Sequence, residues 1–118
     1  MDTTLSLIVI RVIDLEASVR FYSRLGLHFT EEQHGTGPIH FSAFVGETLI
    51  ELYPASPSKI TDGLRLGFMV SDLNGILPQL TSLGGKLISA PTQSPWGYRA
   101  VISDLDGHTL ELTQDQPR

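Results

Sequence analysis

The feature that most constrains the fold is an internal repeat. Residues 8–15 (IVIRVIDL) and residues 66–73 (LGFMVSDL) resemble each other, and at an offset of 58 residues five positions are identical. The identical pairs are Val12 and Val70, Asp14 and Asp72, Leu15 and Leu73, Leu25 and Leu83, and Gly26 and Gly84. A fixed period of this size indicates two tandem copies of one supersecondary unit.

The later parts of the two halves also correspond. Residues 49–52 (LIEL) match residues 109–112 (TLEL) at an offset of 60, so the loops of the two copies differ by two residues. A segment containing Pro54, Pro57 and Gly63 predicts a linker over about residues 54–63. We therefore predict one domain over residues 1–118, with repeat 1 at about 1–53 and repeat 2 at about 64–118.

Each repeat predicts the element order βαβββ. Residues 5–12 form an apolar, β-branched run, Asp14 is a helix N-cap residue, and Gly26 predicts a left-handed helix stop. The apolar face of this first helix is expected to hold Leu15, Val19, Tyr22 and Leu25. Pro78 predicts a late start or a kink in the second helix. The remaining strands are expected at residues 27–32, 39–45, 48–53, 86–89, 98–103 and 109–113.

Composition excludes several function classes. The net charge is −5, and no run of lysine or arginine provides the positive surface that nucleic acids or anionic membranes require. The absence of cysteine excludes disulfides, thiolate nucleophiles, iron–sulfur clusters and CxxC zinc sites. No apolar stretch approaches the roughly 20 residues of a membrane span, and the N-terminus lacks the positive region of a signal peptide. We expect a cytoplasmic protein with a neutral or cationic small-molecule ligand, and no nucleic-acid or membrane partner.

Four segments carry recognisable motifs: residues 11–22 (RVIDLEASVRFY), 70–73 (VSDL), 96–99 (WGYR) and 104–111 (DLDGHTLE), together with Leu25 and Gly26. In these segments the chain resembles the vicinal oxygen chelate superfamily, which includes glyoxalase I, extradiol dioxygenases, fosfomycin-resistance enzymes and bleomycin-resistance proteins. This resemblance implies an α+β fold in which tandem βαβββ repeats form a glyoxalase-like cleft, and it implies a homodimer. It does not specify the reaction, because this scaffold hosts many chemistries.

The resemblance also implies where a metal would bind. Family members place one ligand on the first strand of each repeat and one on the last strand; here these positions hold Leu7 and Arg65, and Glu51 and Glu111. Leucine cannot ligate a metal, and the fixed positive charge of Arg65 opposes a cation. We therefore predict no metal ligand set and no cofactor, with a divalent metal as the alternative.

Strand alternation assigns candidate site residues. Ile8, Ile10 and Val12 should pack under the first helix, with Leu66, Phe68 and Val70 under the second. The other faces should line the cleft, where Glu51 and Glu111 are candidate catalytic bases or, alternatively, partners of Arg65 or Arg11. The predicted ligand-binding residues are Leu7, Arg11, His40, Arg65, Met69, Trp96 and Tyr98.

Aromatic and histidine residues complete the candidates. Trp96 lies in a segment bounded by proline and glycine, residues 91–97 (PTQSPWG), where it could stack on a planar or cationic ligand or fill space under the loop. His40 is expected to face the cleft, whereas His28, His34 and His108 are expected to be solvated.

Three functions follow from these patterns. The first is a small-molecule-binding protein of the glyoxalase/bleomycin resistance type without the family's usual catalytic metal. The second is a metal-dependent or metal-free lyase, isomerase or dioxygenase related to glyoxalase I, with Glu51 or Glu111 as base. The third is an interaction module without a ligand.

Overall fold

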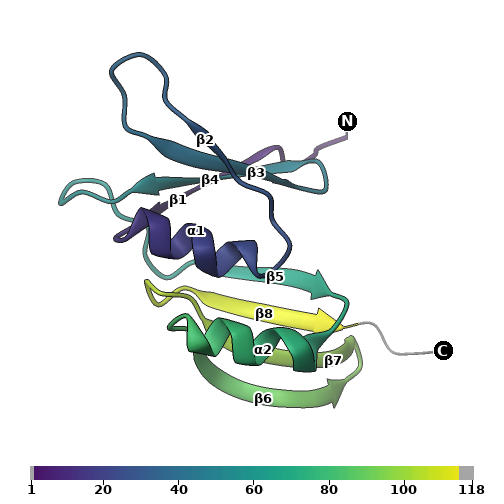
Figure 1. Ribbon diagram of the computed structural model, residues 1–118. Coiled ribbons are helices and arrows are strands. Elements are labelled where there is room, and N and C mark those ends of the chain that lie inside the picture. Colours follow the sequence, from purple (N-terminus) through teal and green to yellow (C-terminus); the bar gives the residue numbers. More distant parts are fainter. Residues whose placement is uncertain (1, 115–118) are drawn as a thin grey trace. The chain divides into compact units, whose positions relative to one another are not determined.

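The computed structural model describes residues 2–114, and the chain divides into two compact units, Met1–Thr61 and Asp62–Arg118. Unit 1 contains β1 (Leu7–Val12), α1 (Leu15–Ser23), β2 (Thr30–Glu32), β3 (His40–Val45) and β4 (Thr48–Pro54). Its sheet has the strand order β1-β4-β3-β2 (Figure 1). β1 is parallel to β4, and the other neighbouring strands are antiparallel.

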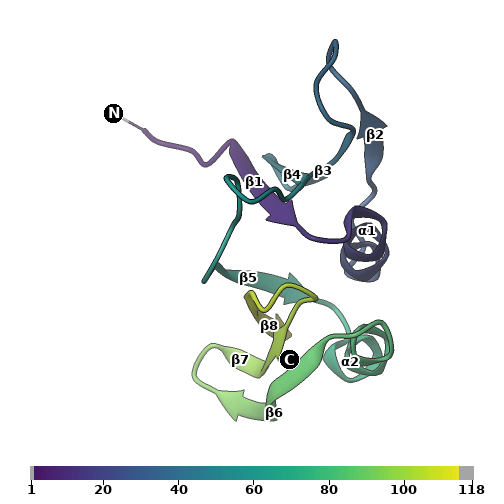
Figure 2. The same ribbon diagram turned by 90° about the vertical axis from the view of Figure 1, so that its left-hand side faces the viewer.

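Unit 2 repeats this topology. It contains β5 (Arg65–Val70), α2 (Leu73–Ser82), β6 (Lys86–Ser94), β7 (Gly97–Ser103) and β8 (Thr109–Gln114). The sheet order is β5-β8-β7-β6, again with one parallel pair, β5 and β8. Figure 2 views both helices nearly end-on, each beside the sheet of its own unit. The predicted α+β fold with two βαβββ repeats is confirmed.

Helix α1 begins after Asp14, as predicted, but it ends at Ser23, three residues before the predicted stop at Gly26. The carboxylate of Asp14 accepts a hydrogen bond from the Ala17 backbone N–H at 3.0 Å, which satisfies one free donor of the first turn. Gly26 has φ 92°, the left-handed conformation that glycine adopts most easily. The buried face differs from the predicted one, because it is centred on Ser18, Phe21 and Tyr22 while Leu15, Val19 and Leu25 are half-buried. Ser18 is small enough to lie within the interface, a feature that apolar periodicity does not detect.

Helix α2 starts at Leu73, so the late start considered for it is wrong. Its buried residues Leu73, Leu77 and Leu80 lie on one face, and Pro78 lies on the exposed one. Pro78 has no N–H to donate to the backbone carbonyl of Asn74. Asn74 is also exposed, so water can satisfy that oxygen.

Two strands differ from their predicted bounds by three residues or more. β2 covers only Thr30–Glu32, the end of the predicted segment. β6 continues past the predicted end at residue 89 to Ser94 and so includes Pro91. Proline is tolerated there because β6 is an edge strand and its pairing with β7 contains register shifts. The predicted loop of residues 91–97 is therefore mostly strand, and only Pro95 and Trp96 form the turn.

The core of each unit lies between its helix and one face of its sheet. Ile10 and Val12 are fully buried, whereas Leu7 on the other face of β1 is 48% exposed. In β5 the burial alternates in the same way, with Leu66, Phe68 and Val70 half-buried. The predicted strand faces are thus confirmed. Within the described residues, the structure has no helix long and apolar enough to cross a membrane.

Candidate functional site

Four polar side chains gather on the sheet of unit 1, on the face opposite its buried apolar residues. The strand register pairs Glu32 with His40 and Ser42 with Glu51, and alternation places all four on this face. We call Glu32, His40, Ser42 and Glu51 the polar cluster. Three strands, β2, β3 and β4, therefore position it.

His40 is buried yet lacks a full set of partners. Its side chain is 1% exposed, and Nδ1 lies 3.2 Å from the Pro38 carbonyl oxygen. A proton on Nδ1 makes this contact a hydrogen bond and leaves the Nε2 lone pair free. Nε2 lies 3.7 Å from Glu32 Oε1 and 3.8 Å from Glu51 Oε2, and it has no hydrogen-bond partner.

Aromatic stacking fixes the orientation of the His40 ring. The Tyr53 ring is stacked on it, with centroids 4.2 Å apart and an interplanar angle of 6°. The guanidinium of Arg11 lies over the Tyr53 ring at 4.7 Å, so Arg11 makes a cation–π contact and is not the partner considered for Glu51.

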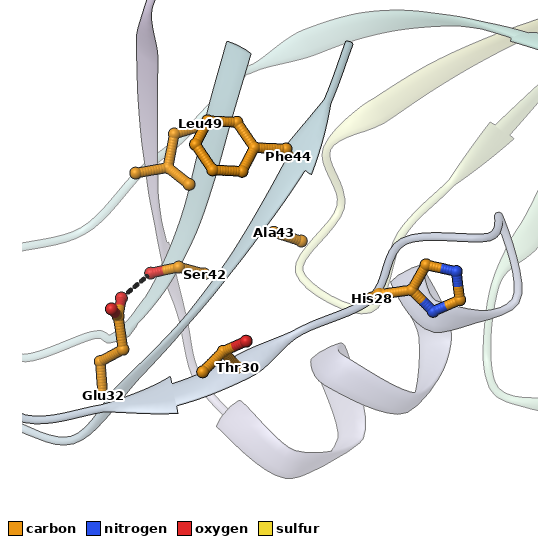
Figure 3. Close-up of a pocket in the computed structure, with 7 residues that line it drawn as sticks. All are labelled: His28, Thr30, Glu32, Ser42, Ala43, Phe44 and Leu49. Atoms are coloured by element: carbon orange, nitrogen blue, oxygen red, sulfur yellow. Dashed lines mark hydrogen bonds between the residues drawn. The ribbon is translucent and has the colours of Figure 1, made fainter. Parts of the chain in front are cut away.

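Ser42 lies between the two carboxylates of the polar cluster. Its hydroxyl donates to Glu32 Oε1, the contact drawn in Figure 3, and it also lies 3.2 Å from Glu51 Oε2. Because a hydroxyl carries one proton, it can donate fully to only one carboxylate at a time. The cluster therefore retains capacity to accept hydrogen bonds or a cation.

A pocket of about 360 Å³ adjoins the polar cluster. Figure 3 shows Glu32 and Ser42 at one end and His28 at the other. Its lining consists of His28, Thr30, Glu32, Ser42, Ala43, Phe44 and Leu49. This volume is near the lower limit for small-molecule sites.

The matching face of unit 2 has a different charge pattern. Glu111 Oε2 accepts from Arg65 Nε at 2.5 Å, and Glu111 Oε1 accepts from Arg99 Nη2. Two guanidinium groups thus neutralise one carboxylate. A pocket of about 370 Å³ lies here, lined by Trp96, Arg99, Glu111 and Thr113.

The structure brings some of the predicted site residues together within each unit. Arg11, His40 and Glu51 share one face in unit 1 with Leu7, and Arg65 pairs with Glu111 in unit 2. Met69 is 62% exposed. It lies two positions along β5 from Gly67, which pairs with Glu111 of β8. Trp96 is 75% exposed, so it does not fill space under a loop.

Tyr98 lies apart from the other candidates of unit 2. Its hydroxyl donates to Asn74 Oδ1 of α2, whereas the next residue, Arg99, reaches Glu111. Successive strand residues point to opposite faces, so Arg99, and not Tyr98, lies on the same face as Glu111.

The prediction that His108 is solvated is wrong. His108 is 1% exposed, and its backbone N–H donates to Asp104 Oδ1 at 2.8 Å. A tight turn, in which the Asp104 N–H also donates to the His108 carbonyl at 2.9 Å, folds this residue inward. His28 and His34 are exposed, as predicted.

The polar residues on or beside these sheet faces that were not among the predicted ones include Glu32, His34, Ser42 and Arg99. The register of the β2–β3 hairpin could have predicted Glu32, because pairing Glu32 with His40 places both side chains on one face of the sheet. Donor atoms of Glu32, His34 and His40 all lie within 4.8 Å of one another.

The family's four metal positions do not fit a metal in this chain. Leu7 carries no donor atom, and Arg65 binds the Glu111 carboxylate that would have to ligate the ion. A cation at Glu111 would have to displace two guanidinium groups.

Comparisons with known proteins agree with this fold. Residues 4–112 match the family model described as Glyoxalase/Bleomycin resistance protein/Dioxygenase superfamily. None of the curated proteins compared with the chain matches it.

Solved structures match the whole length of the chain. TnmS3, an antibiotic binding protein from Streptomyces sp. CB03234, is 24% identical with a TM-score of 0.74, and the match covers 98% of each chain. A glyoxalase/bleomycin resistance protein from the same organism is 25% identical with a TM-score of 0.70, covering 94% of this chain and 100% of that one. A glyoxalase/bleomycin resistance protein/dioxygenase family enzyme from Burkholderia phytofirmans PsJN is 22% identical with a TM-score of 0.74, covering 97% and 100%.

Proposed function

Because the chain belongs to the Glyoxalase/Bleomycin resistance protein/Dioxygenase superfamily, we propose that it binds a small molecule without the family's usual catalytic metal. The observation that carries this proposal is the pairing of Glu111 with Arg65 and Arg99. A carboxylate occupied by two arginines is a poor metal ligand and a weak base, but it can help to shape a binding surface.

The ligand we propose is cationic or aromatic. The Glu32 carboxylate lines the pocket of unit 1, and the Glu51 carboxylate lies beside it in the polar cluster. Both have Ser42 and His40 as neighbours, and among the described residues neither pairs with an arginine or a lysine. A ligand ammonium or guanidinium group could form charge-assisted hydrogen bonds with them. In unit 2 the exposed indole of Trp96 offers a stacking surface. The antibiotic-binding name of TnmS3 is consistent with this ligand class.

We also propose that the protein acts in the cytoplasm as a homodimer, with no nucleic-acid partner. The acidic net charge of −5 supports the last point.

Titration calorimetry with a panel of cationic and aromatic antibiotics, headed by metal-free bleomycin, tests the proposal. We expect one member to bind stoichiometrically, and we expect Glu51→Gln to weaken its binding roughly tenfold or more, equivalent to at least about 1.4 kcal/mol for a lost charged hydrogen bond. The matched control is Glu47→Gln, because Glu47 is an exposed residue of the β3–β4 turn. No binding by any member, or equal losses in the two variants, would contradict the proposal.

A second candidate function is a lyase, isomerase or dioxygenase related to glyoxalase I, with Glu51 rather than Glu111 as base. The favouring observation is that Glu51 lies beside His40 and Ser42 and has a side chain only 14% exposed, whereas Glu111 is held by two arginines. Turnover of a glyoxalase I substrate that is lost in Glu51→Gln and retained in Glu47→Gln would support the enzyme. Absence of turnover in the unmodified protein would support the binding protein.

A further inference from the structure

The β2–β3 hairpin carries three side chains with metal-binding donor atoms. Glu32 ends β2, His34 lies in the connecting loop, and His40 begins β3. We propose that Glu32, His34 and His40 form a binding site for a divalent transition-metal ion. The site goes beyond the proposed function and lies within unit 1, and its residues come from β2, the hairpin loop and β3, whereas the family's metal-ligand positions in this repeat lie on β1 and β4. It shares Glu32 with the carboxylates that we propose to bind a cationic ligand.

His40 is the strongest argument for this site. Its ring is buried, and its Nε2 has no hydrogen-bond partner although two carboxylates lie within 4 Å. An unpaired buried acceptor beside carboxylates is costly unless something positive lies between them. A metal ion satisfies the Nε2 lone pair and the carboxylates together.

The surroundings of His40 match those of a metal-bound imidazole. Its Nδ1 contacts the Pro38 carbonyl at 3.2 Å, and the stacked Tyr53 ring holds its plane. Metal-binding histidines commonly donate their second ring N–H to a carbonyl or carboxylate, which fixes the tautomer and orients the other nitrogen.

The hairpin loop holds His34 next to this nitrogen. The Gly37 N–H donates to the His34 carbonyl at 3.0 Å, and the Gln33 side-chain amide donates to the Gly37 carbonyl at 2.9 Å. The His34 and His40 ring centroids are 5.1 Å apart. His34 is exposed, so its side chain can change rotamer without disturbing the core.

The three donor atoms can reach one ion after a side-chain rotation. They lie within 4.8 Å of one another, whereas ligands about 2.1 Å from a tetrahedral zinc ion lie roughly 3.4 Å apart. His40 Nε2 and Glu32 Oε1 are already 3.7 Å apart, and a rotamer change of the exposed His34 brings in the third ligand. Glu51 Oε2, 3.8 Å from His40 Nε2, is available as a further oxygen ligand.

The donor set selects the kind of ion. Two imidazoles with one or two carboxylates suit Zn²⁺, Co²⁺, Ni²⁺ or Cu²⁺, whereas Mg²⁺ and Ca²⁺ prefer oxygen ligands alone.

Titration of untagged, chelator-treated protein with Zn²⁺, and with Co²⁺ followed by its visible absorption, tests the site. We expect one equivalent to bind, and we expect His34→Ala to weaken binding by roughly tenfold or more. His28→Ala is the matched control, because His28 is another exposed histidine of unit 1 and lies at the far end of the neighbouring pocket from Glu32 (Figure 3). Glu32→Gln should weaken binding as His34→Ala does.

Thermal unfolding provides a second measurement that separates binding from folding. Zn²⁺ should raise the unfolding temperature of the unmodified protein and of His28→Ala more than that of His34→Ala, because the ion stabilises the folded protein in proportion to its affinity for the folded site. Failure of the unmodified protein to bind Zn²⁺ or Co²⁺, or equal affinities in His34→Ala and His28→Ala, would overturn the proposal. Neither result depends on antibiotic binding, so this inference and the proposed function can fail separately.

Discussion

Glu51 and Glu111 occupy matching positions in the two repeats but have different electrostatic surroundings. Arg65 and Arg99 both bind Glu111, whereas Glu51 has Ser42 and His40 beside it. The repeats therefore keep one residue type at the same place on the last strand and give it different partners. The polar chemistry available to a ligand is concentrated at Glu51.

The arginine contacts of Glu111 should contribute little to stability. Arg65 is 55% exposed and Glu111 is 29% exposed, so solvent screens their attraction. We expect Arg65→Met to lower the free energy of unfolding by less than about 1 kcal/mol. Leu110→Ala, at a fully buried position of the same unit, should lower it by about 2–5 kcal/mol. Urea unfolding of both variants checks this prediction, and a loss in Arg65→Met that equals the loss in Leu110→Ala would contradict it.

Sequence alone predicts single residues of the site less well than the strands that carry them. It predicted Glu51, Glu111, His40 and Arg65 as site residues, and the structure places them on the sheet faces away from the core. It also predicted Tyr98, which contacts α2, whereas Arg99 reaches Glu111. A shift of one residue along a strand changes the face to which every side chain points, and the start of β7 depends on its pairing with β6 and β8. His34 was missed because its approach to His40 depends on the loop conformation.

Secondary-structure elements were predictable where short-range chemistry determines them. The caps of both helices follow from Asp14 and Asp72, whose carboxylates accept backbone N–H groups of the first turn. The prediction was weaker where tertiary contacts decide the outcome. The extension of β6 through Pro91 depends on its position at the edge of the sheet.

The end of the first helix provides an element-scale test. At Gly26, φ is 92°, a conformation that is costly for a β-branched residue, and a Cβ at this position would have no atom within 4 Å. Gly26→Val should therefore lower the free energy of unfolding by more than about 1 kcal/mol through the backbone alone.

Gly67→Val is the matched control for this substitution. Gly67 lies on the exposed face of β5, and a Cβ there would be 4.0 Å from the nearest atom, the Glu111 carbonyl oxygen. We expect this variant to be at least as stable as the unmodified protein, because valine favours strands. Denaturant titrations of both variants measure this difference. If Gly26→Val and Gly67→Val have the same free energy of unfolding, the left-handed φ angle of Gly26 does not make this position sensitive to a side chain.

At the scale of the whole molecule, two units of the same topology carry different surfaces. Unit 1 presents carboxylates and histidines, and unit 2 presents arginines around one carboxylate with a tryptophan nearby. The sequence showed the repeat because the two copies share helix N-cap residues, glycines and the spacing of apolar residues. The difference between the surfaces was only partly visible, because it depends on strand pairing.

The proposed homodimer is tested by sedimentation equilibrium. Unit 1 exposes Leu7, Val9 and Phe44 on the sheet face away from its core, and exposed apolar side chains favour association. We expect a mass twice the 12.9 kDa of the chain at micromolar concentrations. A single monomeric species over the whole concentration range would contradict the homodimer.

The central claim is that the protein binds its ligand without the family's catalytic metal and without changing the ligand. Equilibrium dialysis of metal-depleted protein against the bound antibiotic, followed by mass spectrometry of the recovered antibiotic, measures both parts at once. We expect stoichiometric retention of the antibiotic after metal depletion, and its recovery unchanged. Loss of binding on metal depletion, or recovery of a chemically altered antibiotic, would contradict it.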